Sequence, residues 1–469
     1  MNIKIKQLLK NLSVAFAANL VSLFGSALLT LILPKYIGVT QYAYYQLYIF
    51  YTSYVAFLGI GWVEGVYLRY GGEYFDNINK RVFSSQLKIF SLFETILSVI
   101  IFMVTLLNAF SIEKNVVYGS FCLCIVIYMP RALLHNLLQT TGRIKEYATG
   151  VIVGKLIHIV VTSLGLILGQ SSFMWYVGSE LFGRLCASIY IFWICRNIVF
   201  IKHQPMRGVL SEIKENISCG VALMISNIAS MLIIGVIRQA IEFCWDVETF
   251  GKTSLTLSIS SLLLTFINSM ALVLFPMLKR NQEKKLARIY CKIRTGLMIP
   301  ILAFLAFYYP VKVILSEWLP QYADSLNYMA ILFPMCVVES KMTLLINTYM
   351  KALRKERSLL AINFVSLGLS GLFAFVACIV LHSLDMAILS IVLVLAFRCI
   401  IAELTLKRFI QIQVYKDIAL ELAMTTVFII GSWSAGMNGV LIYLVAYIVY
   451  LFIKRKDLKE LYHKVVVKQ

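Results

Sequence analysis

The sequence predicts an all-α integral membrane protein with about 14 transmembrane helices. Hydrophobic residues make up 60% of its 469 residues and charged residues only 14%, whereas soluble domains contain about 25% charged residues. The apolar residues form continuous runs of about 20 residues, the length that a helix needs to cross a bilayer. Such runs differ from the alternating apolar and polar residues of transmembrane β-strands, so helices are the expected spanning elements.

These apolar runs follow one another from the N-terminus to the C-terminus. Each is long enough to satisfy its backbone hydrogen bonds as a helix within the hydrocarbon layer. Short polar loops separate the runs and leave no segment of the size of a soluble catalytic domain. The predicted spans, in order, are 12–33, 43–67, 87–109, 116–138, 148–168, 174–195, 217–241, 252–276, 295–315, 325–350, 359–381, 386–406, 417–434 and 438–453.

The positions of the basic residues predict the topology. The net charge of +20 would also suit nucleic-acid binding, but Lys and Arg recur in every second loop, as in Lys80-Arg81, Lys279-Arg280 and Lys407-Arg408. The opposite loops offer little beyond Lys35 and Lys114. Because positively charged loops remain in the cytoplasm, we expect both termini to be cytoplasmic. The first apolar run is too long for a cleavable signal peptide, and no nucleic-acid partner is expected.

Weak internal similarity predicts a repeat. Asn19–Ser22 matches Asn227–Ser230, and Val39–Ala43 matches Val247–Gly251 at the same offset. The partners are six spans apart, an even number, so the two halves are expected to be parallel and related by pseudo-two-fold symmetry about the membrane normal. Transporters built from repeats bind their substrates between the halves, near the membrane midplane. The predicted organisation is a six-helix half at 1–210, a second at 211–410, and two additional helices with a basic tail at 411–469.

Two regions carry a resemblance to a known family. One is Leu33–Ala43 (LPKYIGVTQYA), and the other comprises Ser226-Asn227, Ser258–Asn268 and Leu274–Arg280. Together with the layout of the whole chain, they resemble the multidrug/oligosaccharidyl-lipid/polysaccharide (MOP) exporter superfamily, in particular the Wzx-type polysaccharide flippases. Family members often have an acidic residue midway along the seventh span, where this chain instead has Arg238 near the outer end.

Charged residues inside the predicted spans are the candidate site. Each would cost about 2.5–3.5 kcal/mol if it faced lipid, so they must line a hydrated cavity or pair with one another. Glu180 and Arg184 are spaced for a pair on one helix face. A cationic surface suits a diphosphate, because guanidinium and ammonium groups bind phosphate; the alternative is that these charges form salt bridges that fix packing. The candidate substrate-binding residues are Arg131, Lys155, Arg184, Arg398, Lys341, Glu180, Glu339 and His158, and Glu94 is a further charge at this depth.

Six tyrosines at the start of the second span have two interpretations. Tyrosine is common at membrane interfaces, and its ring also stacks on sugars. The sequence leaves open whether the group forms an interfacial belt or contacts a glycan. The residues are Tyr42, Tyr44, Tyr45, Tyr48, Tyr51 and Tyr54.

The resemblance implies a flippase that moves an undecaprenyl-diphosphate-linked oligosaccharide across the bacterial plasma (inner) membrane for O-antigen or capsule assembly. Membrane lipids, a polymerase and a chain-length regulator are its expected partners. The alternatives are a peptidoglycan-precursor lipid flippase and a drug or cation antiporter of the same superfamily. A membrane glycan polymerase is disfavoured because the outer loops are short. We expect no enzyme activity, no catalytic residue, no metal and no cofactor.

Overall fold

The computed structural model describes residues 3–108, 110–201, 206–279 and 283–458, with side chains described from residue 20 onward, except at 206–207, 263, 265–279 and 283–285. The predicted motif Leu274–Arg280 and the repeat residue Asn19 therefore lie outside the described side chains. The chain forms two compact units, Met1–Ile228 (unit 1) and Ala229–Gln469 (unit 2). The predicted boundaries at 210 and 410 remain predictions, as does the symmetry between the halves.

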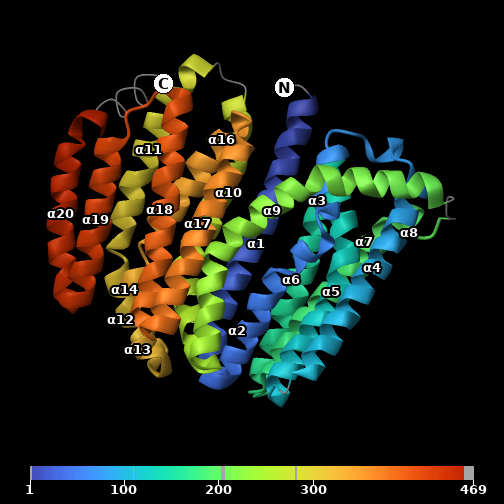
Figure 1. The fold of residues 1–469 in the computed structure, drawn as a ribbon, viewed down its shortest axis with the longest axis horizontal. Coiled ribbons are helices and arrows are strands. Elements are labelled where there is room, and N and C mark those ends of the chain that lie inside the picture. Colours follow the sequence, from blue (N-terminus) through green and yellow to red (C-terminus); the bar gives the residue numbers. More distant parts are fainter. Residues whose placement is uncertain (1–2, 109, 202–205, 280–282, 459–469) are drawn as a thin grey trace. The chain divides into compact units, whose positions relative to one another are not determined.

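Unit 1 contains helices α1 to α8 and the first part of α9, and unit 2 begins within α9. Figure 1 shows these elements along the chain. The bounds in unit 1 are α1 Ile3–Ile37, α2 Val39–Ser53, η1 Val55–Gly59, α3 Trp62–Arg69, η2 Phe75–Asn77, α4 Lys80–Leu107, α5 Ile112–Thr140, α6 Ile144–Ile167, α7 Phe173–Ile194, α8 Arg196–Val199 and α9 Met206–Cys244.

The secondary-structure elements in the described part of unit 2 are all helices, joined by short turns, and they include two π-helical stretches, η4 and η5. The bounds are α10 Val247–Lys279, α11 Glu283–Leu305, α12 Tyr308–Trp318, η3 Pro320–Tyr322, α13 Ala323–Leu326, α14 Met329–Leu332, α15 Met335–Ser340, η4 Lys341–Asn347, α16 Thr348–Ala352, α17 Glu356–Ala374, η5 Phe375–Val380, α18 Leu384–Ile410, α19 Tyr415–Ser434, η6 Gly436–Asn438 and α20 Gly439–Ile453.

The described part of the chain has 11 helices long and apolar enough to cross a membrane, or up to 13 if each of two bent pairs is one span. The predicted all-α membrane fold is therefore confirmed, while the count of 14 stays a prediction. The predicted span 252–276 lies within the continuous helix α10, much of which lacks described side chains.

Two predicted spans are broken by a bend of more than 40°. Predicted span 43–67 is bent by 61° between η1 and α3, and 295–315 is bent by 43° between α11 and α12. At the first break Ile60 and Gly61 have φ of 49° and 80°, and left-handed residues end an α-helix. At the second, Pro310 lies in the first turn of α12, where its ring is incompatible with a helix continuing from residue 306.

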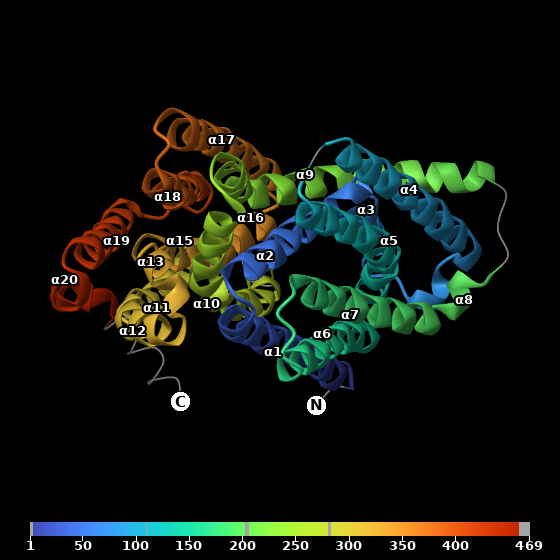
Figure 2. The same cartoon turned by 90° about the horizontal axis from the view of Figure 1, so that it is seen from below.

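Small residues let the helices of unit 1 approach closely. The helices α6 and α7 run side by side (Figure 2), and a Cβ atom on Gly183 would lie 2.6 Å from the carbonyl oxygen of Gly154. Close contact at small residues is a common basis of helix association in membranes. Hydroxyl groups add bonds between helices: Ser98 of α4 donates to the carbonyl of Cys122 in α5, at 2.8 Å.

The first part of α9 lies across the end of unit 1, across the direction of α4 and α5 (Figure 1). The sequence predicts loop up to residue 216, so the helix begins about three turns earlier than expected. Its backbone meets α3 directly, because a Cβ on Gly65 would lie 1.9 Å from the carbonyl oxygen of Asn216. Arg69 donates to Glu212 at 2.9 Å and to Asn216 at 2.8 Å. This segment is therefore held against α3.

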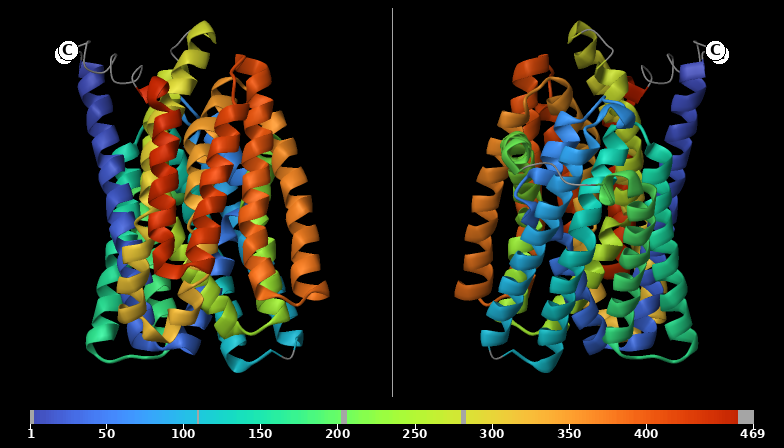
Figure 3. Two further views of the ribbon diagram at one scale, coloured as in Figure 1. Left: turned by 90° about the vertical axis from the view of Figure 1, so that its left-hand side faces the viewer. Right: turned by 90° about the vertical axis from the view of Figure 1, so that its right-hand side faces the viewer.

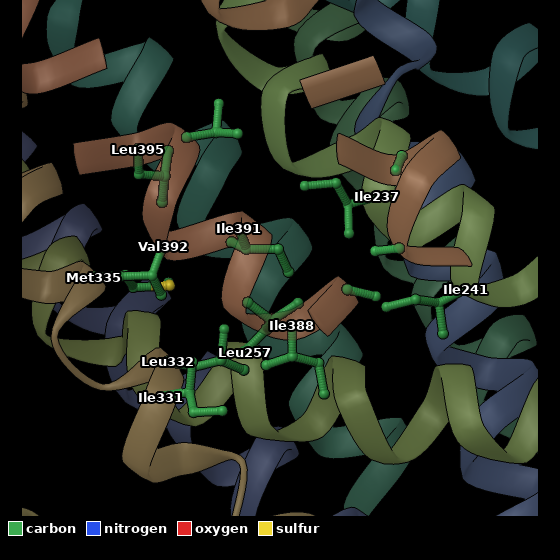
Figure 4. Close-up of a cluster of buried hydrophobic side chains, with 14 of the residues drawn as sticks. Ile237, Ile241, Leu257, Ile331, Leu332, Met335, Ile388, Ile391, Val392 and Leu395 are labelled. Atoms are coloured by element: carbon green, nitrogen blue, oxygen red, sulfur yellow. The ribbon is translucent and has the colours of Figure 1, made fainter. Parts of the chain in front are cut away.

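A hydrophobic cluster forms the interior of unit 2 (Figure 4). Its side chains come from α9, α10, α14, α15, α17, η5 and α18, and within a membrane such side chains stabilise helix contacts by close packing rather than by removal from water. The additional helices α19 and α20 run side by side in the same unit (Figure 3). Labelled members of the cluster are Ile237, Ile241, Leu257, Ile331, Leu332, Met335, Ile388, Ile391, Val392 and Leu395.

Candidate functional site

The candidate site in unit 1 is centred on Glu180 of α7. Its carboxylate pairs with Arg184 one turn along the same helix, which confirms the predicted pair. It also accepts a hydrogen bond of 2.6 Å from the hydroxyl of Tyr48 in α2. A charged carboxylate with both a cation and a hydroxyl donor is well satisfied at membrane depth. Glu180 is thus fixed between α2 and α7.

Two guanidinium groups meet the same aromatic ring. The Cζ atoms of Arg131 and Arg184 each lie 5.0 Å from the centroid of Tyr128 in α5. The electron-rich face of an aromatic ring attracts cations at such distances. Tyr128 therefore holds two cations near one another despite their mutual repulsion.

Arg131 and Lys155 have no ion pair with a carboxylate within the part of the chain that the structure describes. The Nε of Arg131 is buried and lacks a hydrogen-bond partner there, although both side chains belong to partly exposed residues. Unpaired charges that faced lipid would each cost about 2.5–3.5 kcal/mol. We infer that this surface of unit 1 is hydrated. The charges of the cluster are Arg131, Lys155, Arg184 and Glu180, an excess of two cations.

His158 lies one turn after Lys155 on α6 and is buried. Its Nε2 has no hydrogen-bond partner among the described residues, and its Cβ lies against the position of Gly183 in α7. One turn further along, the hydroxyls of Thr162 and Ser179 are 2.8 Å apart. The structure therefore places His158 at the contact of α6 with α7, beside the cationic cluster.

In unit 2, the predicted residues Arg398 and Glu339 meet each other. The Nη1 of Arg398 lies 3.3 Å from Oε1 of Glu339. The same guanidinium donates to Asn363 at 3.0 Å and to Ser230 at 2.7 Å. All three of its nitrogens thus have partners, an arrangement typical of a residue that fixes helix packing.

Lys341 is also paired, at the start of the π-helical stretch η4. Its Nζ lies 2.8 Å from Glu403 of α18 and 2.6 Å from Glu421 of α19. Arg294 of α11 lies 2.8 Å from Glu403 and 3.0 Å from Glu421, and Tyr290 donates to Glu403 at 2.7 Å. Two buried cations therefore balance two buried carboxylates. This network ties four elements of unit 2 together.

The sequence interpretation missed Glu403, Glu421 and Arg294 as members of this network. A signal for the first two exists, because each is an acidic residue inside a predicted span. The signal for Arg294 is weaker, since it directly precedes the predicted span 295–315 and does not lie inside it.

The tyrosines of α2 are not a simple interfacial belt. Tyr42, Tyr45 and Tyr48 are buried, and Tyr48 holds Glu180. Tyr51 instead has its hydroxyl 3.3 Å from that of Tyr118 in α5. The belt interpretation is therefore wrong for the three buried rings, whose burial also removes them from contact with a glycan in this structure.

Comparison with known proteins identifies the fold. No family model matches the sequence, and no curated protein matches it. Among solved structures, the lipid II flippase MurJ in an inward closed conformation is similar over 95% of this chain and 99% of its own, with a TM-score of 0.65 and 13% identity. The chain has the same fold as this structure.

Two further solved structures have a similar fold. An inward-facing multidrug resistance MATE family transporter of the MOP superfamily has a TM-score of 0.61 at 13% identity, over 86% of this chain and 97% of its own. A MATE in complex with MaL6 has a TM-score of 0.52 at 14% identity, over 86% and 96%. The predicted fold is confirmed, and the protein is a multi-pass membrane protein whose structural neighbours are flippases and transporters. Membership of the MOP superfamily and of its Wzx-type subfamily stays a prediction.

Proposed function

We propose that this protein is a flippase that moves an undecaprenyl-diphosphate-linked oligosaccharide repeat unit across the bacterial plasma membrane by alternating access. The product would serve O-antigen or capsule assembly, and both termini would be cytoplasmic. The observation that carries the proposal is the excess of cations at membrane depth in unit 1. Three cations share that surface with one carboxylate, and two of them have no carboxylate partner among the described residues.

The cluster matches the chemistry of a lipid diphosphate. In the proposal Arg131 and Lys155 bind the diphosphate, because a guanidinium fork and an ammonium point charge both bind phosphate oxygens. Arg184 is already paired with Glu180, so it positions the site and adds to its positive field. The partners of Arg398, Glu339 and Lys341 in unit 2 assign those residues to packing in this proposal.

A cation or drug antiporter is the alternative that the MATE neighbours suggest. An excess of positive charge repels cationic cargo, and the two charge networks of unit 2 are neutral at Arg398–Glu339 and at Arg294, Lys341, Glu403 and Glu421. The cation excess therefore favours an anionic cargo. A peptidoglycan-precursor flippase, the activity in the name of the MurJ neighbour, would use the same diphosphate chemistry, so the glycan must be decided by experiment.

Deletion of the gene tests the cargo. We expect a complete undecaprenyl-diphosphate repeat unit to accumulate on the cytoplasmic face and surface polysaccharide to be lost. Accumulation of a peptidoglycan precursor would assign the protein to that alternative. Complete units that reach the outer face without being polymerised would indicate a polymerase, and an unchanged lipid pool would refute both flippase assignments.

Substitutions test the cationic cluster when variant genes are expressed in the deletion strain. A hydrogen bond to a charged group contributes about 1.5–3 kcal/mol, so Arg131→Gln and Lys155→Gln should each reduce export about tenfold or more, with normal protein abundance. Arg131→Lys, which keeps the charge, should retain more export than Arg131→Gln. The matched control is Lys145→Gln, an exposed cation at the start of the same helix as Lys155. Full export by the Arg131→Gln/Lys155→Gln double variant would refute the site.

A further inference from the structure

A cationic cavity lies in unit 2, beside the Arg294–Lys341–Glu403–Glu421 network, which Arg294 links to the cavity residue Asp417. Its volume is about 650 Å³, within the range of about 300–1,000 Å³ that small-molecule sites occupy. It is formed where α11 begins, where α18 passes to α19, and where α20 ends. Five cations and two carboxylates line it, an excess of three positive charges: Arg288, Lys292, Lys407, Lys416, Lys454, Asp417 and Asp457.

The two carboxylates are already paired with cations. The Nζ of Lys454 lies 2.6 Å from Asp417 and 2.7 Å from Asp457, and Asp417 also pairs with Arg294. Burial by itself lowers the pKa of Lys454, but the two carboxylates outweigh it and raise the pKa. Lys454 therefore stays charged, and both of its carboxylate partners line the same cavity.

The other four cations have no such partner. Arg288, Lys292 and Lys416 make no ion pair with any carboxylate that the structure describes. Lys407 also forms no ion pair with a described carboxylate, and its Nζ lies 3.8 Å from the ring centroid of Tyr415. Four cations that have no ion pair with a described carboxylate therefore line one space.

Backbone groups add to this field. The helix α19 is 20 residues long and starts at Tyr415, and the preceding Val414 provides no side-chain cap for its first N–H groups. Tyr415, Lys416 and Asp417 of that first turn line the cavity. The N-terminus of a helix favours bound anions through its free N–H groups and its dipole, which here act together with the four cations.

We propose that this cavity binds a phosphate group, and that the phosphate belongs to a lipid headgroup. Exposed apolar side chains adjoin the cations along the chain: Phe409 follows Lys407 by two residues, and Phe452 and Ile453 directly precede Lys454. Aromatic and apolar residues beside basic ones are typical of a membrane–water interface. The cavity thus meets the depth at which a phospholipid or a polyprenyl phosphate carries its charge.

Binding of defined lipids to the full-length protein tests the proposal. The protein is reconstituted in phosphatidylcholine nanodiscs, and phosphatidylglycerol is titrated while retained lipid is counted by native mass spectrometry. Each basic residue near a membrane surface contributes about 1 kcal/mol to anionic lipid binding. The variants Arg288→Gln/Lys416→Gln and Lys292→Gln/Lys407→Gln should therefore each bind about 30-fold more weakly.

The matched control is Arg357→Gln/Arg408→Gln, which removes two exposed cations that do not line the cavity. Unchanged binding by the control and weakened binding by both cavity variants would support the site. Equal affinities for all four proteins, or equal loss in the control, would overturn it.

A second titration distinguishes the source of the phosphate. Inorganic diphosphate is added to the detergent-solubilised protein and its thermal unfolding is followed. Stabilisation by diphosphate that disappears in the cavity variants, without selective phosphatidylglycerol binding, would overturn the lipid assignment in favour of a soluble phosphate compound. These results do not depend on export, so failure here would leave the proposed flippase function standing.

Discussion

The replacement Lys341→Met decides between two roles for a buried lysine. In the structure, this lysine is the cation shared by Glu403 and Glu421, at 2.8 and 2.6 Å. Its removal leaves two carboxylates, 0% and 6% exposed, with Arg294 as the remaining cation of the buried network. Removing one partner of a buried ion pair costs about 3–5 kcal/mol. For a unit of this size, that loss lowers Tm by roughly 6–20 °C.

The assay is thermal unfolding of the purified protein in a neutral detergent, together with export in cells. Lys351→Met is the control, because it removes an exposed cation of the neighbouring helix α16 and should change stability by less than about 0.5 kcal/mol. A double-mutant cycle adds specificity. Lys341→Met with Glu421→Gln removes one charge of each sign, so its loss should be about 0.5–3 kcal/mol smaller than the sum of the single losses.

One result would refute this reasoning. If Lys341→Met unfolds at the wild-type temperature and is present at normal abundance but fails to export, the ammonium group acts on the cargo. The sequence interpretation of Lys341 as a substrate-binding residue would then be correct, and the ion-pair network would contribute little to the fold.

Two further stability predictions follow from the packing of unit 1. Gly65→Ala places a Cβ 1.9 Å from the carbonyl oxygen of Asn216, so α3 and α9 must separate at a cost of about 1–3 kcal/mol; Gly178→Ala, which has open space, is the control, and equal Tm values would contradict the close crossing. Glu94 is buried with no described hydrogen-bond partner for either oxygen, so Glu94→Gln should change stability by less than about 1 kcal/mol, and a larger drop in Tm would reveal a partner.

Much of the fold follows from hydropathy. Continuous apolar runs predict spans because the bilayer leaves a helix as the economical way to satisfy the backbone. Breaks within a run are harder to predict, because hydropathy is averaged over about 19 residues and does not register a local change of φ. The left-handed pair Ile60 and Gly61 therefore escaped prediction, although the glycine and Pro310 at the second break are visible signals.

The candidate site, too, was predictable from the sequence only in part. Glu180 and Arg184 could be paired from the sequence, since residues four apart on a helix share a face. The partners of Lys341 and Arg398 could not be chosen, because they come from other helices and many pairings fit the same composition. Tyr128 was not recognised either, since an aromatic residue in a span is normally packing, and only its place between Arg131 and Arg184 gives it a role.

The sequence by itself determined that this protein is a bundle of membrane-spanning helices and that charges lie within them. Both conclusions depend on composition along the chain, which the bilayer converts directly into structure. Only the tertiary structure decided which charges are neutralised. Arg398 and Lys341 meet carboxylates from other helices, whereas Arg131 and Lys155 meet none that the structure describes. The physical reason is that the energy of a buried charge depends on distances of a few ångströms between helices, which no single segment specifies.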